Sequence, residues 1–504
     1  MNTMTNREAT LPIQLSATEK STIRTAAYGA VTLMSFADVA GSPHKTATAG
    51  TLALTSATGP VGHVLAVRKR DYKLQTKSSA ALADQVLPAL TDSVALLKER
   101  DAAEAENFRN TVIVAIGAAA GIDRRQPSPP VTSMIRKITA ALDAAGQARP
   151  ELQKLADQIA EAGFTGVQLR VNDEHGEWTG SAGVAVLGES ARPSTDGHFR
   201  IGSNTKTFTA TVVLRLVAEG RIGLDTPVVE YLPEFDLDAR VTVRMLLQHT
   251  SGIFNFTGEH MEDGTVVPGI VWSGREWVED RFRTYEPAEL VRLALSKPAR
   301  FEPGADWSYA NTNYVLARLV VEKVTGRSLA DEMRRLVIGP LGLTGTSMPE
   351  TRPDVPAPHA HAYYAYEEDG AEKTVDVTRQ NPSWISTGGD MISTTKDLHT
   401  FIAALTGGKL LPEELRDEMF TPHPKVPYGL GVFVQDTGDG KVVTHNGGIS
   451  GHAGLMYSTL DGKTLTAGLN YVDDADLSKA AAFQASVKIL VDTVFGGEGN
   501  GEGE

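Results

Sequence analysis

The run Gly202-Ser203-Asn204-Thr205-Lys206-Thr207-Phe208 combines a turn with the start of a helix, and the rest of the fold is best understood from it. Apolar side chains continue at helical spacing as far as Val217. This pattern predicts a turn at Gly202 and a buried helix that begins at or near Ser203. The first N–H groups of a helix lack intrahelical partners and favour developing negative charge. Lys206 would lie one turn later on the same face.

Ser203 and Lys206 are candidates for a nucleophile and its base. A serine hydroxyl attacks a carbonyl only when a base lies within hydrogen-bond reach. The same Ser-x-x-Lys pattern occurs at Ser42 and at Ser393. Ser42 precedes a proline in what reads as a polar loop, and Ser393 precedes what looks like a helix-capping box. The first motif therefore does not identify a catalytic site by itself.

Two further motifs follow in order, Tyr309-Ala310-Asn311 and His445-Asn446-Gly447. Tyr-x-Asn occurs once in the chain, whereas His-x-Gly occurs again at His452. We favour the copy at His445 because it follows a strand-like run, 441–444, and precedes several glycines. The three ordered motifs together indicate an acyl-transfer site in which Lys206 and Tyr309 are the candidate bases.

At these residues the sequence resembles the beta-lactamase-like serine hydrolases, a family that includes class C beta-lactamases and D-alanyl-D-alanine carboxypeptidases. Three other segments are similar to the family: 246–252 (Leu-Leu-Gln-His-Thr-Ser-Gly), 301–304 (Phe-Glu-Pro-Gly), and Trp384 ahead of Gly388-Gly389. The resemblance covers roughly residues 150–495.

The resemblance implies a role for each motif residue. Ser203 would be the nucleophile, Lys206 and Tyr309 would share the proton transfers, and Asn311 would orient the substrate amide. The N–H groups of Ser203 and Gly448 would form the oxyanion hole. Glycines on a strand edge also let a substrate approach the backbone closely. The full set of expected substrate-binding residues is Asn311, Trp384, His445, Gly447 and Gly448.

His445 stands where many lactamase relatives carry the lysine of a Lys-Thr-Gly triplet, although other relatives have histidine. Lysine is charged at any ordinary pH, whereas histidine titrates near neutrality. We therefore expect this substrate-facing strand to lose positive charge as pH rises. Weaker recognition of a free carboxylate would follow.

For fold class the resemblance implies an α/β (α+β) architecture of the beta-lactamase/transpeptidase type. An antiparallel sheet would be flanked by helices, with a helical subdomain between the first and second motifs. The sequence predicts strands that fit this arrangement. They cover 166–171, 183–186, 431–434, 441–444 and 464–471.

Residues 1–147 are expected to form a separate helical domain of unknown function, ahead of a hydrolase domain at 148–495. Apolar residues recur there at helical spacing, although Pro88 makes two short helices as plausible as one long helix. A proline-rich stretch, 126–130, interrupts the region. Residues 1–147 carry a small net positive charge, whereas the whole chain has a net charge of −14. This difference suggests that the region has a partner of its own, whose nature is unknown. The glycine- and glutamate-rich tail, 496–504, is expected to be disordered.

Composition fits a large enzyme, because 504 residues with 41% hydrophobic residues can build a substantial core. Cysteine is absent, which excludes disulfides and thiolate metal sites. We expect no cofactor and no metal, since His359 and His361 lack a third ligand at a recognisable spacing.

No phosphate loop or nucleic-acid pattern is found, and no apolar run is long enough for a transmembrane segment. A cytosolic location is the default without a signal-like N-terminus, whereas the resemblance points outside the cytoplasm.

The sequence thus predicts a serine hydrolase that forms an acyl-enzyme on Ser203, with a peptide or small molecule as its substrate. A D-alanyl-D-alanine carboxypeptidase-like or beta-lactamase-like activity is the first expectation. A small-ester esterase or D-amino-acid amidase of the same fold is the alternative, and a non-catalytic penicillin-binding sensor is another. The motifs do not choose between peptide, beta-lactam and ester substrates, because the rate of deacylation depends on where water sits.

Overall fold

The computed structural model describes residues 15–37, 42–67, 71–121, 127–144, 149–261, 264–436 and 440–496. The chain divides into two compact units, Met1–Arg149 and Pro150–Glu504. The tail expected at 496–504 lies outside the described residues, apart from Gly496.

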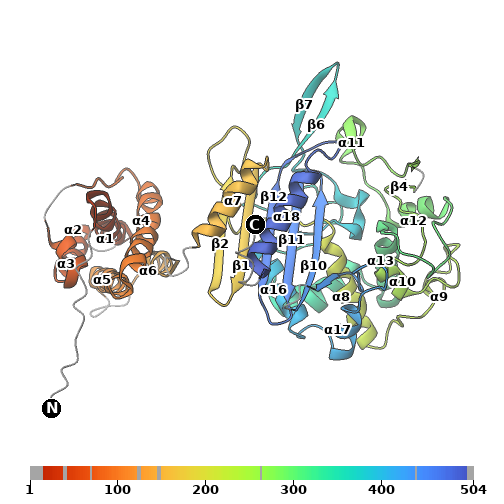
Figure 1. The fold of residues 1–504 in the computed structure, drawn as a ribbon, viewed down its shortest axis with the longest axis horizontal. Coiled ribbons are helices and arrows are strands. Elements are labelled where there is room, and N and C mark those ends of the chain that lie inside the picture. Colours follow the sequence, from red (N-terminus) through yellow and green to blue (C-terminus); the bar gives the residue numbers. More distant parts are fainter. Residues whose placement is uncertain are drawn as a thin grey trace, which may run out of the picture. The chain divides into compact units, whose positions relative to one another are not determined.

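The first unit is a bundle of helices, as Figure 1 shows. Buried apolar side chains such as Leu33, Leu90 and Phe108 form its core. The predicted helical N-terminal region is therefore confirmed. Its helices are α1 (Ala17–Ala37), α2 (Pro43–Thr55), α3 (Gly59–Ala66), α4 (Ser79–Arg100), α5 (Ala102–Ala120) and α6 (Pro129–Ala144).

Two details of this unit differ from the simplest sequence interpretation. Pro88 lies inside α4, which continues through it as one helix. The next helix starts only after Asp101, whose carboxylate accepts the Ala103 N–H at 2.9 Å and so satisfies a free donor at the start of α5. The expectation of a loop at Ser42 and the residues after it is wrong, because Ser42 is the N-cap residue of α2 and the helix begins at Pro43.

The second unit is built on a six-stranded antiparallel sheet, which confirms the predicted fold class. Its strand order is β2 (Gly176–Gly183), β1 (Gly166–Asp173), β12 (Thr464–Asn470), β11 (His452–Thr459), β10 (Lys441–Ile449) and β9 (Phe433–Asp436).

The strand predicted at 183–186 is wrong, because the strand that pairs with β1 is β2, which ends at Gly183. Gly183, the last residue of β2, has φ of 71°, and this left-handed conformation ends the extended strand there. β2 reads Gly-Glu-Trp-Thr-Gly-Ser-Ala-Gly, and this polar, glycine-rich composition gives little strand signal.

Helices cover both faces of this sheet. In Figure 1, α7 (Pro150–Glu161) and α18 (Ala480–Phe495) lie across one face, and their apolar side chains share a core with β1, β11 and β12. On the other face lie α8 (Asn204–Ala218) and α16 (Thr395–Thr406). The rings of Phe208 and Phe401 join these two helices, with centroids 3.6 Å apart. The helix after Ser203 is thus held against the sheet.

A mostly helical region lies between the first and second motifs, as predicted. It contains α9 (Val228–Tyr231), α10 (Val243–Gln248), the short hairpin β4 (Glu259–His260) and β5 (Val266–Val267), α11 (Gly274–Asp280) and α12 (Pro287–Leu295). The next helix, α13 (Asn311–Thr325), begins in the second motif. Within the described part of the chain, every helix is too short or too polar to cross a membrane.

The remaining elements lie outside the six-stranded sheet and, apart from β3 and β13, fall between α13 and β9 along the chain. They are α14 (Leu329–Met333), the π-helix η2 (Arg334–Ile338), α15 (Gly339–Leu341), β6 (Tyr363–Glu368), β7 (Ala371–Asp376), η3 (Pro382–Trp384), η4 (Ser386–Gly388), β8 (Ile392–Ser393), which pairs with β3 (Phe199–Arg200), α17 (Glu413–Met419) and β13 (Val472–Asp473).

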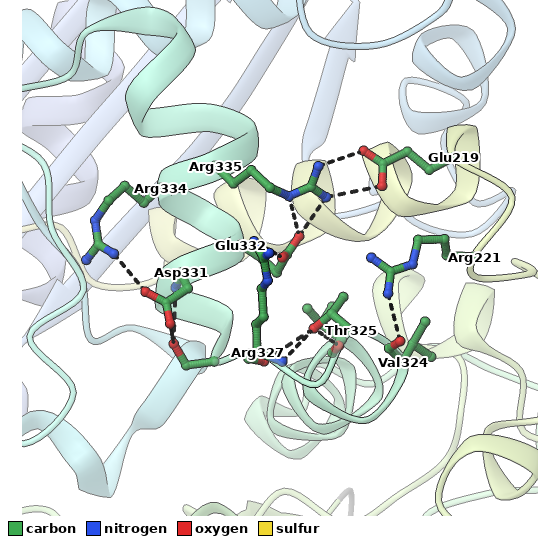
Figure 2. Close-up of polar contacts among 11 residues, drawn as sticks. Glu219, Arg221, Val324, Thr325, Arg327, Asp331, Glu332, Arg334 and Arg335 are labelled. Atoms are coloured by element: carbon green, nitrogen blue, oxygen red, sulfur yellow. Dashed lines mark hydrogen bonds and ion pairs between the residues drawn. The ribbon is translucent and has the colours of Figure 1, made fainter.

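An ion-pair network holds the far end of α8, as Figure 2 shows. Arg335 donates to both carboxylate oxygens of Glu219, the C-terminal cap of α8, at 3.1 Å each. The same guanidinium donates to Glu332 at 2.7 and 3.0 Å. Glu332 is 1% exposed, and Arg327 lies 3.8 Å from it on another side. Arg335 therefore compensates a buried charge while it fixes the nucleophile helix to α14.

Replacement of Arg335 by leucine should lower the free energy of unfolding by about 2 kcal/mol. Removal of one partner from a fully buried pair costs about 3–5 kcal/mol, and the loss is smaller here because Arg335 is partly exposed and Arg327 remains. Urea denaturation followed by tryptophan fluorescence measures this unit alone, since all 5 tryptophans lie in it. Arg334→Leu is the control, because Arg334 pairs with the exposed Asp331. Equal effects of the two substitutions would contradict this interpretation.

Candidate active site

The turn before α8 places Ser203 at the helix N-terminus, as predicted from the sequence. Gly202 has φ of 51°, and a Cβ on it would lie 2.5 Å from the Gly448 nitrogen. A side chain there would be both strained and too close to β10. Ser203 makes no capping hydrogen bond to its helix. Its hydroxyl is therefore available to other groups.

Two side chains reach the Ser203 hydroxyl. Lys206 Nζ lies 3.0 Å from Ser203 Oγ, and Tyr309 Oη lies 2.8 Å from the same atom. Lys206 Nζ also lies 4.6 Å from the centre of the Tyr309 ring. The structure thus brings together the three residues that the sequence predicted as catalytic, although they come from α8 and from the loop before α13.

The surroundings of Lys206 favour a neutral amine. The side chain is fully buried, and this burial lowers the pKa of Lys206 well below its usual value. Its other partners are two carbonyl oxygens, Asn311 Oδ1 at 2.8 Å and the Gly388 backbone oxygen at 2.5 Å. A neutral amine has two N–H groups to donate to these oxygens. Its lone pair is then left for the Ser203 proton.

Burial shifts the pKa of Tyr309 in the opposite direction to that of Lys206. Burial raises the pKa of Tyr309 well above the ordinary value of a phenol. The phenol is therefore protonated at neutral pH and donates to Ser203 Oγ. Before reaction, the arrangement accordingly suits Lys206 as the proton acceptor and Tyr309 as a proton donor, whereas the sequence left the two roles open.

Asn311 is the first residue of α13, and three contacts fix it. Its side-chain oxygen accepts from Lys206, its Nδ2 lies 3.4 Å from Thr257 Oγ1, and its backbone N–H donates to Asn255 Oδ1 at 3.0 Å. Sequence inspection missed Asn255, Thr257 and the Gly388 carbonyl. The glycine pair at 388–389 was the one available signal, and a Cβ on Gly388 would lie 2.9 Å from Asn311 Oδ1.

The third motif lies on an open strand edge. Pairing between β10 and β9 ends at Thr444, whereas pairing with β11 continues to Ile449. A Cβ on Gly447 would lie 2.3 Å from the Ser203 nitrogen, so only glycine lets the strand lie so close to the nucleophile turn. Gly448 follows directly, and its nitrogen would lie 2.5 Å from a Cβ placed on Gly202. This geometry is compatible with an oxyanion hole formed by the N–H groups of Ser203 and Gly448.

The predicted titration of His445 near neutrality is wrong. The ring is 1% exposed, and burial together with the nearby Lys206 lowers the pKa of His445 to about 3. Its Nδ1 lies 2.8 Å from its neighbour's backbone oxygen, and its Nε2 lies 3.3 Å from Tyr428 Oη. Desolvation outweighs the intrinsic pKa of the imidazole. His445 is therefore neutral over the whole ordinary pH range.

The buried histidines predict acid sensitivity of the fold. Burial lowers the pKa of His445 to about 3 and that of His452 well below its usual value, whereas an unfolded histidine titrates near 6.5. Because the unfolded state binds more protons below pH 6.5, stability should fall as pH drops from about 6.5 toward 3, by up to about 1.4 kcal/mol per pH unit for each ring. Urea denaturation at pH 7, 6 and 5 measures this slope. His452→Asn should reduce it, and an unchanged slope would contradict the assignment.

The contacts described for Trp384 are with residues other than the catalytic side chains. It stacks on Trp272 with centroids 6.4 Å apart, and its Nε1 donates to Gln380 Oε1 at 3.3 Å. The ring lines a cavity of about 370 Å³ together with Ile270 and Tyr285. The contact of Trp384 with substrate stays a prediction.

His359 and His361, the two candidate metal ligands, lie side by side, and one carboxylate contacts His361. The His359 and His361 rings stack at 5.5 Å, and His361 Nδ1 lies 2.6 Å from Asp376. Across the ranges that the structure describes, no group of three or more histidine, cysteine, aspartate or glutamate side chains is arranged to hold a metal ion.

A helix-flanked antiparallel sheet with a serine, a lysine and a tyrosine in contact defines a serine hydrolase of the beta-lactamase/transpeptidase type. A family model described as Beta-lactamase matches residues 151–470. The chain belongs to this family, which confirms the resemblance noted in its motifs.

Among solved structures, the chain is similar to a D-stereospecific amidohydrolase from Streptomyces sp., with 36% identity and a TM-score of 0.56 over 66% of this chain and 98% of that one. It is 28% identical over 351 residues to penicillin-binding protein 4* of Bacillus subtilis, which covers 66% of this chain and 74% of the relative. It is 35% identical over 226 residues to esterase EstB of Burkholderia gladioli. That alignment covers 42% of this chain and 55% of the relative.

Proposed function

We propose that this protein is an amidohydrolase that forms an acyl-enzyme on Ser203 and cleaves amides or esters of D-amino acids whose leaving group carries no carboxylate. One observation carries the choice of leaving group. His445 is buried and neutral where many relatives carry a charged lysine. The third motif therefore offers no cation to a free carboxylate. The similarity to a D-stereospecific amidohydrolase supports the D-configuration.

Acylation would use the neutral amine of Lys206 as the base. Ser203 Oγ attacks the substrate carbonyl while its proton moves to Lys206 Nζ, 3.0 Å away. The N–H groups of Ser203 and Gly448 stabilise the resulting oxyanion, and one such donor is worth about 3 kcal/mol. Asn311 orients the acyl side of the substrate.

Departure of the leaving group would use Tyr309. The phenol, which contacts Ser203 Oγ at 2.8 Å, donates its proton to the leaving amine as the C–N bond breaks. The proton held by Lys206 then restores the phenol, so that both groups return to their starting states. Water then attacks the acyl carbonyl while Lys206 takes its proton. The bond between the acyl group and Ser203 Oγ breaks, the proton passes from Lys206 to Oγ, and the acid is released.

A second candidate is a peptidase or lactamase that acts on substrates ending in a free carboxylate, such as D-Ala-D-Ala peptides. Its support is the 28% identity to penicillin-binding protein 4*. The neutral His445 makes it the less favoured of the two. A non-catalytic sensor is less favoured again, because Lys206 and Tyr309 both contact the Ser203 hydroxyl.

A matched pair of peptides distinguishes these candidates. A D-Ala-D-Ala peptide with a C-terminal carboxylate and the same peptide with a C-terminal amide would be compared alongside D- and L-phenylalanine amides and short-chain esters. We expect the amide peptide to be cleaved at least about tenfold faster, because the carboxylate would lose hydration with no cation to compensate it. A tenfold ratio corresponds to about 1.4 kcal/mol. Faster cleavage of the carboxylate form, or cleavage by Ser203→Ala, would contradict the proposal.

A further inference from the structure

The main chain on both sides of Tyr309 is bound to one residue, His249. The N–H of Ser308 donates to the His249 backbone oxygen at 3.0 Å. The N–H of Ala310 donates to His249 Nδ1 at 3.2 Å. Between these two bonds, the imidazole lies against the phenol ring, with centroids 4.4 Å apart and planes inclined by 37°. His249 thus contacts the chain before the tyrosine, its ring, and the chain after it.

The backbone of His249 is held in an uncommon conformation. The residue ends α10 with φ of 63°, in the left-handed region that few residues other than glycine adopt. Its own N–H donates to the Leu246 oxygen, and the next N–H, from Thr250, donates to the Met245 oxygen. These bonds turn the carbonyl and the ring of His249 toward 308–310.

Neighbouring contacts establish which nitrogen of His249 carries the proton. Ser251 Oγ lies 2.6 Å from Asn313 Oδ1 and donates to it, so the Asn313 amide nitrogen faces His249 Nδ1 at 3.1 Å. Nδ1 therefore accepts from both Asn313 and Ala310. An acceptor nitrogen carries no proton, so the neutral ring is protonated at Nε2.

The surroundings keep this ring neutral. His249 is fully buried, and its burial, with the nearby bases Lys206 and His445, lowers the pKa of His249 well below its usual value. The remaining ring neighbours are aromatic: Trp307, Tyr314 and Tyr428, at centroid distances of 6.0, 5.3 and 5.1 Å. Nδ1 thus stays an acceptor throughout the neutral pH range.

We propose that His249 is a positioning residue, which holds the backbone of 308–310 so that Tyr309 Oη stays within hydrogen-bond distance of Ser203 Oγ. None of the contacts described for it involves the Ser203 hydroxyl, so it acts through Tyr309. This inference rests on the proposed function, since it gives His249 a role in the proton transfers assigned to Tyr309. A misplacement of about 1 Å can lower a rate about 100-fold.

Two amide substitutions test the role of Nδ1. Asparagine places its oxygen close to where Nδ1 lies and readily adopts left-handed backbone angles, whereas glutamine carries its oxygen one methylene farther. We expect His249→Asn to keep kcat/KM within about fivefold of wild type and His249→Gln to lose about 100-fold, mainly in kcat. Equal losses in the two variants would overturn the proposal. If the glutamine variant does not fold, a 100-fold loss in the asparagine variant would overturn it, and retained activity would support it.

His452→Asn is the matched control. His452 is equally buried, and its Nδ1 also contacts an amide nitrogen, that of Asn470, at 3.2 Å. It has no described contact with Tyr309. We expect this variant to keep the wild-type kcat/KM, and a loss as large as that of His249→Gln would show that any buried histidine has this effect and would overturn the proposal.

A double-mutant cycle separates a positioning role from a general structural role. In a Tyr309→Phe background, His249→Gln should lower the single-turnover acylation rate by no more than about twofold, because the phenol through which it acts is gone. A loss of about 100-fold in both backgrounds would overturn the proposal. The single variant Tyr309→Phe tests the proposed function independently: wild-type activity in that protein would remove the role of Tyr309, whatever His249 does.

Discussion

Replacement of Ser203 by alanine should abolish turnover and the acyl-enzyme together, with a loss in kcat of about 10⁵ to 10⁶. The magnitude follows because the residue supplies the atom that forms the covalent bond. The fold should be unaffected, since the Ser203 side chain does not cap α8. Stopped-flow measurement of product release gives the rate of turnover, and urea denaturation in parallel gives the free energy of unfolding.

The second Ser-x-x-Lys sequence in this unit provides a control for that experiment. Ser393 is fully buried, and its hydroxyl lies 2.9 Å from Thr346 Oγ1. The residue after it, Thr394, caps α16 by accepting the Asp397 N–H. Ser393→Ala should therefore lower stability by about 1 kcal/mol and leave kcat near wild type. Loss of turnover in this variant, or retained turnover in Ser203→Ala, would contradict the assignment of the nucleophile.

Replacement of Lys206 by arginine should be nearly as damaging as replacement by methionine. Arginine keeps a positive charge but does not lose its proton in proteins, so it cannot accept the Ser203 proton. We expect both variants to lower the single-turnover acylation rate by about 10³-fold, within the range for removal of a general base. Substantial acylation by the arginine variant would show that Lys206 acts as a cation instead.

The wild-type pH profile provides a second test of the same residue. Because the neutral amine is the active form, acylation should become faster as pH rises through the pKa of Lys206 and then level off. Burial lowers that pKa well below the ordinary lysine value, so the plateau should begin well below pH 10.5. A rate that continues to rise up to pH 10.5 would mean that Lys206 is charged at neutral pH.

The sequence predicted side chains well and backbone groups poorly. Ser203, Lys206 and Tyr309 could be found because each needs a particular chemistry at a particular place in an ordered set of motifs. The Gly388 carbonyl, which accepts from Lys206 at 2.5 Å, has no such signature, because any residue provides a carbonyl. Only the need for a glycine beside Asn311 marked its position.

The charge state of His445 could not be predicted from its motif. Its place in the third motif was evident, but its charge depends on burial and on the distance to Lys206, which only the folded chain determines. The strand β2 was missed for a related reason. Its polar, glycine-rich sequence gains its strand structure from pairing with β1 rather than from its own propensity.

The most direct test of the central claim is to find where an acyl group attaches. The protein would be mixed with the p-nitrophenyl ester of N-acetyl-D-phenylalanine, quenched in acid during the burst of product release, digested and examined by mass spectrometry. We predict that the acyl mass is found on Ser203 in the wild-type protein and is absent from Ser203→Ala. A full burst with the label on another residue, or with no labelled peptide, would contradict the claim that Ser203 is the nucleophile.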